Sequence, residues 1–185
     1  MQKLTIFIAV LILTACNSKE KSMGGTGTDT TAMTTNNTNE MPLDTKGYTM
    51  MYSSSFTMGP NKNAETVLDL WKNWDANNLD AAKEFFADSV TMYFSDGGSM
   101  MGKKDTVIAM TKPYRNSLGE VSSAVHAIVS LHSTDKNEDW VNIWGVEYRN
   151  NKKDSTEMFE TWRFNKDGKA DLLYQYKADN PKKMK

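Results

Sequence analysis

The sequence predicts an α+β domain in which helices gather on one face of a strongly curved, mostly antiparallel sheet. Three observations lead to this prediction. Residues 61–118 contain three segments with helical periodicity and one strand-like run, residues 120–178 contain four strand-like segments, and the loops between those segments are four or five residues long. Loops of this length favour antiparallel hairpins, and helices that precede such a meander pack together against the sheet.

The helical part of the domain contains three amphipathic segments. The first is expected to begin at Asn63, which can cap a helix, and to run for about twelve residues. After a second, short helix, residues 89–94 form a strand that ends in the turn at residues 95–98. The third helix is expected to begin near Asp105, and Pro113 should kink or shorten it. The inward-facing residues are expected to be Val67, Leu70, Trp71 and Trp74 in the first helix, Leu79, Ala82, Phe85 and Phe86 in the second, and Val107, Ile108, Thr111 and Tyr114 in the third.

Length and charge limit the function classes that the chain can belong to. Its 185 residues, 39% hydrophobic and 24% charged, suffice for one domain with a substantial core. The formal net charge of -1 provides no basic surface for a polyanion, so nucleic acid is not an expected partner. The thirteen methionines suit adaptable apolar surfaces, although ordinary core packing accounts for most of them.

The first fifteen residues have the pattern of a secretory signal peptide. Lys3 supplies a positive start, and the ten apolar residues from Leu4 to Leu13 would cover only about 15 Å as a helix, against about 30 Å of hydrocarbon. The sequence at residues 13–16, Leu-Thr-Ala-Cys, resembles the bacterial lipobox. The resemblance implies that residues 1–15 are removed and that Cys16 becomes the lipidated first residue. The alternative, a free core cysteine, is disfavoured because the next thirty residues contain nothing that resembles a core.

A lipidated Cys16 would place the protein in the cell envelope, with its domain outside the cytoplasm. Two or three acyl chains anchor a protein durably, because each buried CH₂ contributes about 0.8 kcal/mol. Residue 17 is asparagine and not the aspartate that resembles an inner-membrane retention signal, which favours the outer membrane. We therefore expect a membrane-anchored protein without a cytosolic nucleotide cofactor, and no cofactor of another kind is indicated.

Between Cys16 and the helices lie two further segments. Residues 16–46 are rich in threonine, asparagine, glycine and serine and are predicted to be a disordered tether, because they cannot bury enough apolar surface to offset their ordering entropy. Residues 47–60 are predicted to form an extended arm or edge strand, because their apolar residues follow a period of two. Residues 61–180 are assigned to the folded domain and residues 181–185 to a basic tail.

Several motifs of the folded part resemble those of one known superfamily. They are Trp71-x-x-Trp74-Asp75 in the first helix, the run LDAAKEFFADSVTMYF at residues 79–94, Gly102 before the third helix, and WRFNKDGKADLLYQY at residues 162–176. Over residues 62–178 they resemble the nuclear transport factor 2-like (NTF2-like) superfamily, which includes ketosteroid isomerases and SnoaL-like polyketide cyclases. The resemblance implies a cone with the concave sheet as its inner wall, the helices as its lid and a homodimer through the outer sheet face.

The resemblance also indicates where catalytic groups would lie. The basic aspartate of ketosteroid isomerases would fall at Tyr93 or Phe94, and their oxyanion tyrosine at Leu70 or Trp71, so both roles are missing here. Their second oxyanion residue is a carboxylic acid that falls at Glu160. If Glu160 is buried, its pKa would rise and it could donate a hydrogen bond to a ligand.

His126 is the other candidate catalytic residue. A His–Glu pair can serve as acid and base, which requires His126 and Glu160 to converge in the cavity, together with Glu147. The alternatives are that His126 is an ordinary hydrogen-bonded or exposed strand residue and that Glu160 is paired with Arg149 or Arg163.

Further expectations concern metals and ligands. His126 and His132 lie six residues apart on one strand, on one face but too far apart to share a metal, so no metal site is expected. In the strand at residues 139–149 both faces are largely apolar, and we expect Trp140 and Trp144 on the outer, covered face. The residues expected to contact a ligand are the wall residues Trp71, Trp74 and Trp162, the orienting residues Tyr93 and Gln175, and the inner-face residues Ile143 and Glu147.

The sequence leaves two functions from different classes open. The favoured one is a non-catalytic module, whose cone binds a small apolar ligand or whose sheet face binds a protein partner. The alternative is an isomerase- or cyclase-type enzyme with Glu160 and His126 as acid–base groups. A solvent-reachable pocket with a second titratable group within hydrogen-bond reach of Glu160 would favour the enzyme, and a filled interior would favour the binding module.

Overall fold

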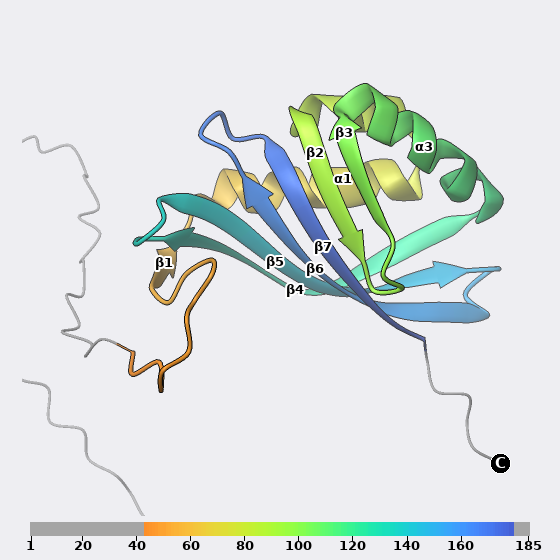
Figure 1. Ribbon diagram of the computed structural model, residues 1–185. Helices are drawn as coiled ribbons and strands as arrows, with labels where there is room; N and C mark the ends of the chain where they lie inside the picture. Colours follow the sequence, from red (N-terminus) through yellow and green to blue (C-terminus); the bar gives the residue numbers. More distant parts are fainter. Residues whose placement is uncertain (1–42, 180–185) are drawn as a thin grey trace, which may run out of the picture. The chain divides into compact units, whose positions relative to one another are not determined.

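The computed structural model describes residues 43–179, and within this range three helices lie against a seven-stranded sheet (Figure 1). The predicted signal peptide, Cys16, most of the predicted tether and the predicted basic tail lie outside the described residues. The elements are β1 (Phe56–Met58), α1 (Asn61–Asp75), α2 (Leu79–Ala82) with a following 3₁₀ turn (Lys83–Phe85), β2 (Phe86–Phe94), β3 (Ser99–Lys103), α3 (Lys104–Ser117), β4 (Val121–Ser133), β5 (Glu138–Arg149), β6 (Asp154–Phe164) and β7 (Ala170–Asp179).

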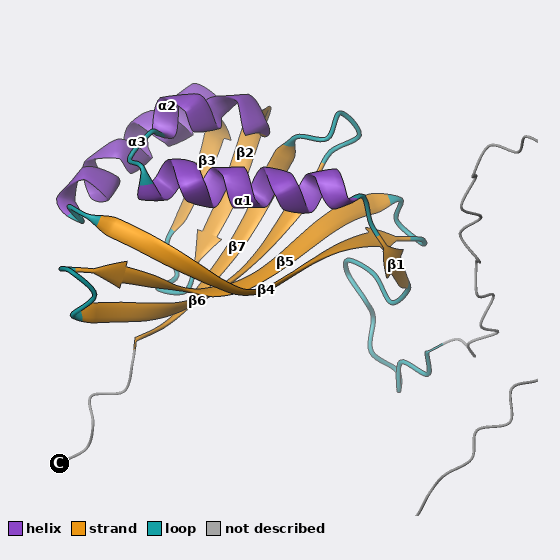
Figure 2. Cartoon of the chain, turned by 180° about the vertical axis from the view of Figure 1, so that it is seen from behind, coloured by secondary structure: helices purple, strands orange, loops and turns teal. Residues whose placement is uncertain are grey.

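The sheet has the strand order β1-β4-β5-β6-β7-β2-β3. Neighbouring strands are antiparallel except for β2 and β7, which are parallel. All three helices lie on one face of the sheet, and the long strands bend around them (Figure 2). The predicted α+β class and mostly antiparallel sheet are confirmed. The sequence analysis predicted no strand that corresponds to β3. This short strand pairs with β2 and follows it through a tight turn, in which Gly97 has a φ of +84°.

Helix α1 begins at Asn61, two residues earlier than expected, with Pro60 as its N-cap residue. Asn63 does not cap the helix. Its side chain is buried and donates a hydrogen bond to Asp139 on β5. The inward face matches the predicted spacing, since Val67, Leu70 and Trp71 are all buried against the sheet. Burial of such side chains contributes about 1.5–3 kcal/mol each and sets the orientation of α1 over the concave face.

Helix α3 continues through Pro113 to Ser117, so Pro113 does not shorten the helix, and the alternative of a kink there stays a prediction. A proline inside a helix removes one backbone hydrogen bond and costs about 3 kcal/mol. Packing on both sides of Pro113 offsets that cost. Val107 and Ile108 are buried upstream, and Arg115 downstream is 1% exposed and bonded to the end of α1.

A β-bulge in β4 reverses the expected facing of its histidines. Val125 pairs with Gly145 and Ala127 pairs with Trp144, so His126 is the extra residue. Ser123, before the bulge, is hydrogen-bonded to Asp75 of α1, and Ile128, after the bulge, packs on the core, so both face the helices. In a strand without a bulge, two residues that are five positions apart would face opposite sides. His126 and His132 therefore lie on opposite faces, and the expectation of a shared face was wrong.

Residues 47–60 run along the edge and outer face of the sheet. Within them, β1 pairs with the end of β4, and Tyr52 packs edge-on against Trp140 with a ring-centroid distance of 5.2 Å. The hydroxyl of Tyr52 is also hydrogen-bonded to that of Tyr174 on β7. As a result Trp140 is 6% exposed, whereas Trp144 on the same outer face is 40% exposed.

Candidate functional site

A cavity of about 600 Å³ lies between the helices and the concave face of the sheet. Ligand pockets in proteins range from roughly 300 to 1,000 Å³, and this cavity falls within that range. Most of its lining side chains are apolar or aromatic. They are Leu70, Trp71, Trp74, Leu79, Ala82, Phe86, Met92, Phe94, Met100, Ile108, Tyr114, Met158, Trp162 and Leu173, and the polar lining residues are Ser95, Asp96, Thr111, Ser123, Glu147, Glu160, Gln175 and Lys177.

Glu160 on β6 is a buried carboxylate in the wall of this cavity, with 4% of the residue exposed. Its Oε2 accepts hydrogen bonds from the indole N–H groups of Trp71 at 2.7 Å and Trp162 at 2.9 Å. Its Oε1 accepts a third hydrogen bond from the side-chain amide of Gln175 at 2.7 Å. These three residues come from α1, β6 and β7, so the carboxylate joins the helix layer to the sheet.

The surroundings of Glu160 act on its pKa in opposite directions. Burial disfavours the charged carboxylate and raises its pKa above the ordinary value of 4.5. The hydrogen bonds from Gln175, Trp71 and Trp162 favour the charged form, and so does the more distant charge of Lys177. Burial is the larger effect, so the pKa of Glu160 is raised.

The alternative of an ion pair between Glu160 and an arginine was wrong. Arg163 forms its ion pair with Asp171 at 3.0 Å, beside Trp140 on the outer face. Arg149 lies 3.5 Å from Glu147. Both arginines are placed by their own strand neighbours, so Glu160 is held by neutral donors.

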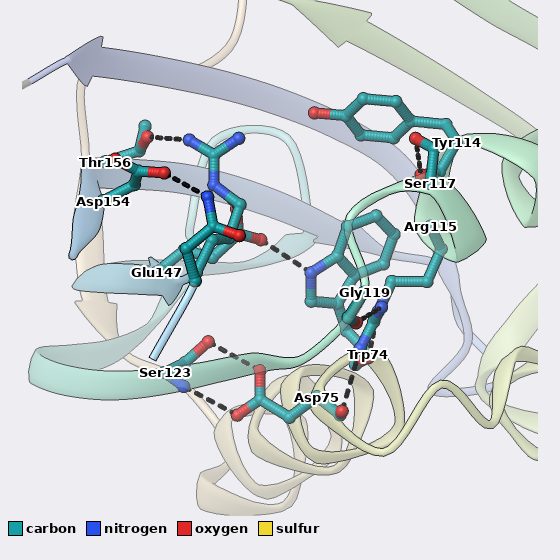
Figure 3. A network of polar contacts seen from close by, with 12 residues as sticks. Trp74, Asp75, Tyr114, Arg115, Ser117, Gly119, Ser123, Glu147, Asp154 and Thr156 are labelled. Atoms are coloured by element: carbon teal, nitrogen blue, oxygen red, sulfur yellow. Dashed lines mark hydrogen bonds and ion pairs between the residues drawn. The ribbon is translucent and has the colours of Figure 1, made fainter. Parts of the chain in front are cut away.

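Glu147 on β5 forms a second polar contact between the sheet and α1, nearer the end of the helix (Figure 3). It is 6% exposed and lines the cavity. Its Oε2 accepts a hydrogen bond of 2.7 Å from the indole N–H of Trp74, and its Oε1 lies 3.5 Å from Arg149. Trp71 and Trp74, which were predicted to share one face of the helix, each donate a hydrogen bond to a glutamate on the sheet, Glu160 and Glu147 respectively.

The end of α1 is fixed by a buried guanidinium group (Figure 3). Arg115 donates hydrogen bonds to the backbone carbonyls of Trp74 at 2.6 Å and Asp75 at 2.9 Å, and to that of Gly119 at 2.8 Å. A cation at a helix C-terminus also interacts favourably with the helix dipole. The carboxylate of Asp75 accepts hydrogen bonds from the backbone and hydroxyl of Ser123. These contacts hold Trp74 in place above β4 and β5.

Other lining residues were not singled out as ligand contacts by the sequence. Lys177 is half-buried, and its Nζ lies 5.5 Å from the ring centre of Tyr114 on α3. Asp96, in the turn after β2, is exposed. A signal for Lys177 was present, because a strand residue two positions after Gln175 must share its face. Tyr114 was expected to face inward, although no contact with a ligand was assigned to it.

Most of the predicted ligand contacts line the cavity, but two do not. Trp71, Trp74, Glu147, Trp162 and Gln175 do so, together with Glu160. Tyr93 instead stacks on Tyr174 with a ring-centroid distance of 5.0 Å, because the alternation of β2 turns its neighbours Met92 and Phe94 toward the cavity. Ile143 is fully buried in the core.

His126 does not lie at the cavity. Its side chain is about half exposed, and its Nδ1 is 3.8 Å from Glu157 of β6. The bulge in β4 accounts for this position, since it turns His126 away from the helices. The proposed convergence of His126 with Glu160 and Glu147 is therefore wrong.

Two other kinds of site are absent from residues 43–179. No cluster of three or more histidine, cysteine, aspartate or glutamate side chains in this range is arranged to hold a metal ion. None of the helices in this range is both long enough and apolar enough to cross a membrane.

Comparison with known proteins identifies the fold. No family model and no curated protein matches the sequence. Among solved structures, a proposed ketosteroid isomerase from Kribbella flavida DSM 17836 aligns over 68% of this chain and 84% of its own, with a TM-score of 0.53 and 6% identity. A SnoaL-like protein of unknown function from Burkholderia thailandensis E264 aligns over 65% of this chain and 98% of its own, with a TM-score of 0.52 and 16% identity.

A third similar structure is the Orange Carotenoid Protein of Anabaena (Nostoc) sp. PCC 7120 binding canthaxanthin. It aligns over 74% of this chain but only 41% of its own, with a TM-score of 0.50 and 16% identity. Identities this low show the fold alone. The chain therefore has the NTF2-like fold, as its sequence motifs indicated, and shares that fold with ketosteroid isomerase-like and SnoaL-like proteins.

Proposed function

We propose that this protein is a lipid-anchored envelope domain whose cone binds a small, largely apolar molecule without catalysing a reaction on it. The observation that carries the proposal is the cavity of about 600 Å³, lined mainly by apolar and aromatic side chains. A few inward-facing polar groups, above all Glu160, can fix the orientation of a bound molecule. Such a combination is the usual composition of a small-molecule site.

Binding is favoured over catalysis by the partners of Glu160. An enzyme that works with a pair of acid and base groups needs a second titratable group within reach of the same reacting atoms. Within residues 43–179 the hydrogen-bond partners of Glu160 are Trp71, Trp162 and Gln175, none of which can take or give a proton near neutral pH. Glu147 is occupied by Trp74 and Arg149. The interior is hollow, which meets one of the two conditions for an enzyme, but no second titratable group is hydrogen-bonded to Glu160 among the described residues. The hollow space makes a small molecule a better candidate for the bound partner than a protein on the sheet face.

The test for binding is native mass spectrometry of the full chain, extracted in a mild detergent from the cells that produce it. A bound molecule should add a discrete mass that collisional activation removes. Met158→Trp places an indole in the cavity, because Met158 lines it and is 8% exposed. Met101→Trp is the matched control, because Met101 is 67% exposed. Loss of the added mass in the first variant alone supports the proposal, and equal retention in both variants contradicts it.

The anchoring part of the proposal rests on the lipobox-like sequence around Cys16. Metabolic labelling with an alkyne fatty acid should attach label to the wild-type protein, and Cys16→Ser should abolish it. Fractionation of the envelope should place the labelled protein in the outer membrane. A wild-type protein without label would refute the anchor and leave the binding proposal unaffected.

The proposal also includes pairing of two copies through the outer face of the sheet. Trp144, Phe159 and Tyr176 form an aromatic row there, with ring-centroid distances of 5.1 and 5.9 Å. Trp144 is 40% exposed and Tyr176 is 52% exposed, and large exposed apolar rows favour association. Sedimentation velocity should give the mass of a dimer for the wild type and of a monomer for Trp144→Glu. A monomeric wild type would refute the pairing.

A further inference from the structure

Within residues 43–179, Glu160 is a buried carboxylate without a cationic partner. Among the ion pairs of residues 43–179 none includes Glu160 within 4.0 Å, and its three hydrogen-bond donors are neutral. A carboxylate removed from water is costly unless a cation lies beside it. Glu147, the other buried acid of the cavity, has Arg149 at 3.5 Å. Among the described residues, Glu160 is thus the buried acid of this cavity that has no cationic side chain within 4.0 Å, and only the more distant charge of Lys177 acts on it.

The hydrogen bonds that the described residues make to Glu160 leave one acceptor position open. Its Oε2 takes two indole N–H groups, which occupy both lone pairs of that oxygen. Its Oε1 takes one N–H from Gln175, so one lone pair remains. Because Glu160 lines the cavity, a bound molecule with an N–H group can reach this position.

The walls around Glu160 favour a positive charge as well. Six aromatic side chains line the cavity, and three of them are tryptophans, whose ring faces attract cations most strongly. The protein already uses two of these rings in this way. The guanidinium of Arg115 lies 5.6 Å from the ring centre of Trp74, and the Nζ of Lys177 lies 5.5 Å from that of Tyr114.

The charged residues that line the cavity also favour a cationic ligand over an anionic one. Asp96, Glu147 and Glu160 are acidic, and Lys177 is the basic residue among the described residues that line the cavity. Lys177 is half-buried beside Tyr114 and contributes only a longer-range charge interaction to Glu160. An anionic ligand would meet this excess of carboxylates, whereas a cation would be attracted by it.

We infer that the ligand of this pocket is an apolar organic cation, such as a hydrophobic amine or quaternary ammonium compound, whose charge lies against Glu160 between Trp71 and Trp162. The inference rests on the proposed function, because it names the class of molecule that the same cavity binds. A cation that can also donate an N–H group fills the open position on Oε1. The apolar body of the molecule then lies against the methionine and phenylalanine side chains of the cavity.

The experiment uses three probes that share one apolar body and differ in charge: 1-adamantylammonium, 1-adamantanol and 1-adamantanecarboxylate. Their dissociation constants for the full chain in detergent are measured at pH 7.5 by calorimetry and by tryptophan fluorescence. An alkylammonium ion remains protonated at this pH, because such amines have pKa values of about 10. The ammonium probe should bind on the order of tenfold more tightly than the alcohol, and the carboxylate should bind most weakly.

Variants of Glu160 and Lys177 test whether these two residues cause the preference for the ammonium probe. Glu160→Gln should remove the preference for the ammonium probe and retain binding of the alcohol, which also shows that this variant is folded. Lys177→Gln removes the lining cation from a half-buried position and should strengthen ammonium binding several-fold. Asp88→Asn is the matched control for net charge, because the Asp88 side chain is 99% exposed, and it should leave all three affinities unchanged.

The outcomes separate this inference from the proposed function. Equal affinities of the wild type for the ammonium ion and the alcohol would overturn the inference and leave the proposed function standing. An ammonium preference that survives in Glu160→Gln would also overturn it, because another group would then recognise the charge. Failure of all three probes to bind would count against both.

Discussion

Gly145 lies on β5 where that strand passes beneath α1, and its replacement by alanine should displace the wall of the cavity. A Cβ atom at this position would lie 2.5 Å from the backbone carbonyl oxygen of Ala124 and 2.8 and 2.9 Å from two ring carbons of Trp71. Contacts below 3.0 Å cannot be retained, and a strand backbone moves less easily than a side chain. The φ of Gly145 is not in the left-handed region, so the effect arises from these contacts alone.

The magnitude follows from the cost of overpacking a core. Overpacking costs typically 1–3 kcal/mol, and for a chain of this length each kcal/mol lowers the melting temperature by about 2–4 °C. Gly145→Ala should therefore lower the free energy of unfolding by about 1–3 kcal/mol in urea. It should also shift the tryptophan emission, because the Trp71 ring must move away from residue 145.

Gly98→Ala provides the control for this experiment. A Cβ atom at Gly98 would meet only the side-chain oxygen of Asp96 at less than 3.0 Å, and that side chain can rotate away. Its effect should stay within about 0.5 kcal/mol, as for most surface substitutions. If Gly145→Ala were as stable as the wild type, with unchanged emission, the close packing of Trp71 on β5 would be refuted.

Three further predictions concern the polar contacts of the site. Trp71→Phe removes one hydrogen bond to the carboxylate of Glu160 and should lower the free energy of unfolding by about 1.5–3 kcal/mol in urea, so an unchanged value would contradict that contact. Because burial raises the pKa of Glu160, the folded protein holds this proton to higher pH than the unfolded chain. The free energy of unfolding that this group contributes should therefore fall as the pH rises from about 4.5 through the pKa of the folded protein. Urea titrations at several pH values measure this decrease, and Glu160→Gln should remove it. Arg115→Met leaves buried backbone carbonyls unpaired, each worth about 1–3 kcal/mol, and should lower the melting temperature far more than Arg163→Met; equal effects would contradict the anchoring of α1.

The order of elements was readable from the sequence because it depends on local periodicity. The spacing of Val67, Leu70, Trp71 and Trp74 defined one face of α1, and that face is the one packed on the sheet. The ends of the helix were less predictable. Asn63 has the right side chain for a cap, but tertiary contact with Asp139 determines its position.

The position of Glu160 could be inferred only through the resemblance to a known family. Nothing in the local sequence states that this side chain meets Trp71, which lies 89 residues away in the chain. Such pairings depend on how β6 is placed under α1, and that placement depends on the register of the whole sheet. The family pattern supplied this information, whereas the periodicity of a single strand could not.

The facing of His126 shows the limit of alternation as a guide. Strand alternation predicts faces correctly only while the pairing continues without an extra residue. The bulge at His126 is not marked by glycine or proline, because its neighbours are Val125 and Ala127. Tyr93 was misplaced for a different reason, since its expected contact depended on the matched family position and not on the alternation that puts Met92 and Phe94 inward.

The most direct test of the account is a crystal structure of the protein under xenon pressure. Xenon enters apolar cavities that are empty or hold a weakly bound molecule. The account predicts xenon, or the density of a retained ligand, among Leu70, Phe86 and Leu173 and next to a carboxylate of Glu160 that still accepts the two indole hydrogen bonds. Side chains that fill this space, with neither xenon nor ligand inside, would contradict the proposed binding function.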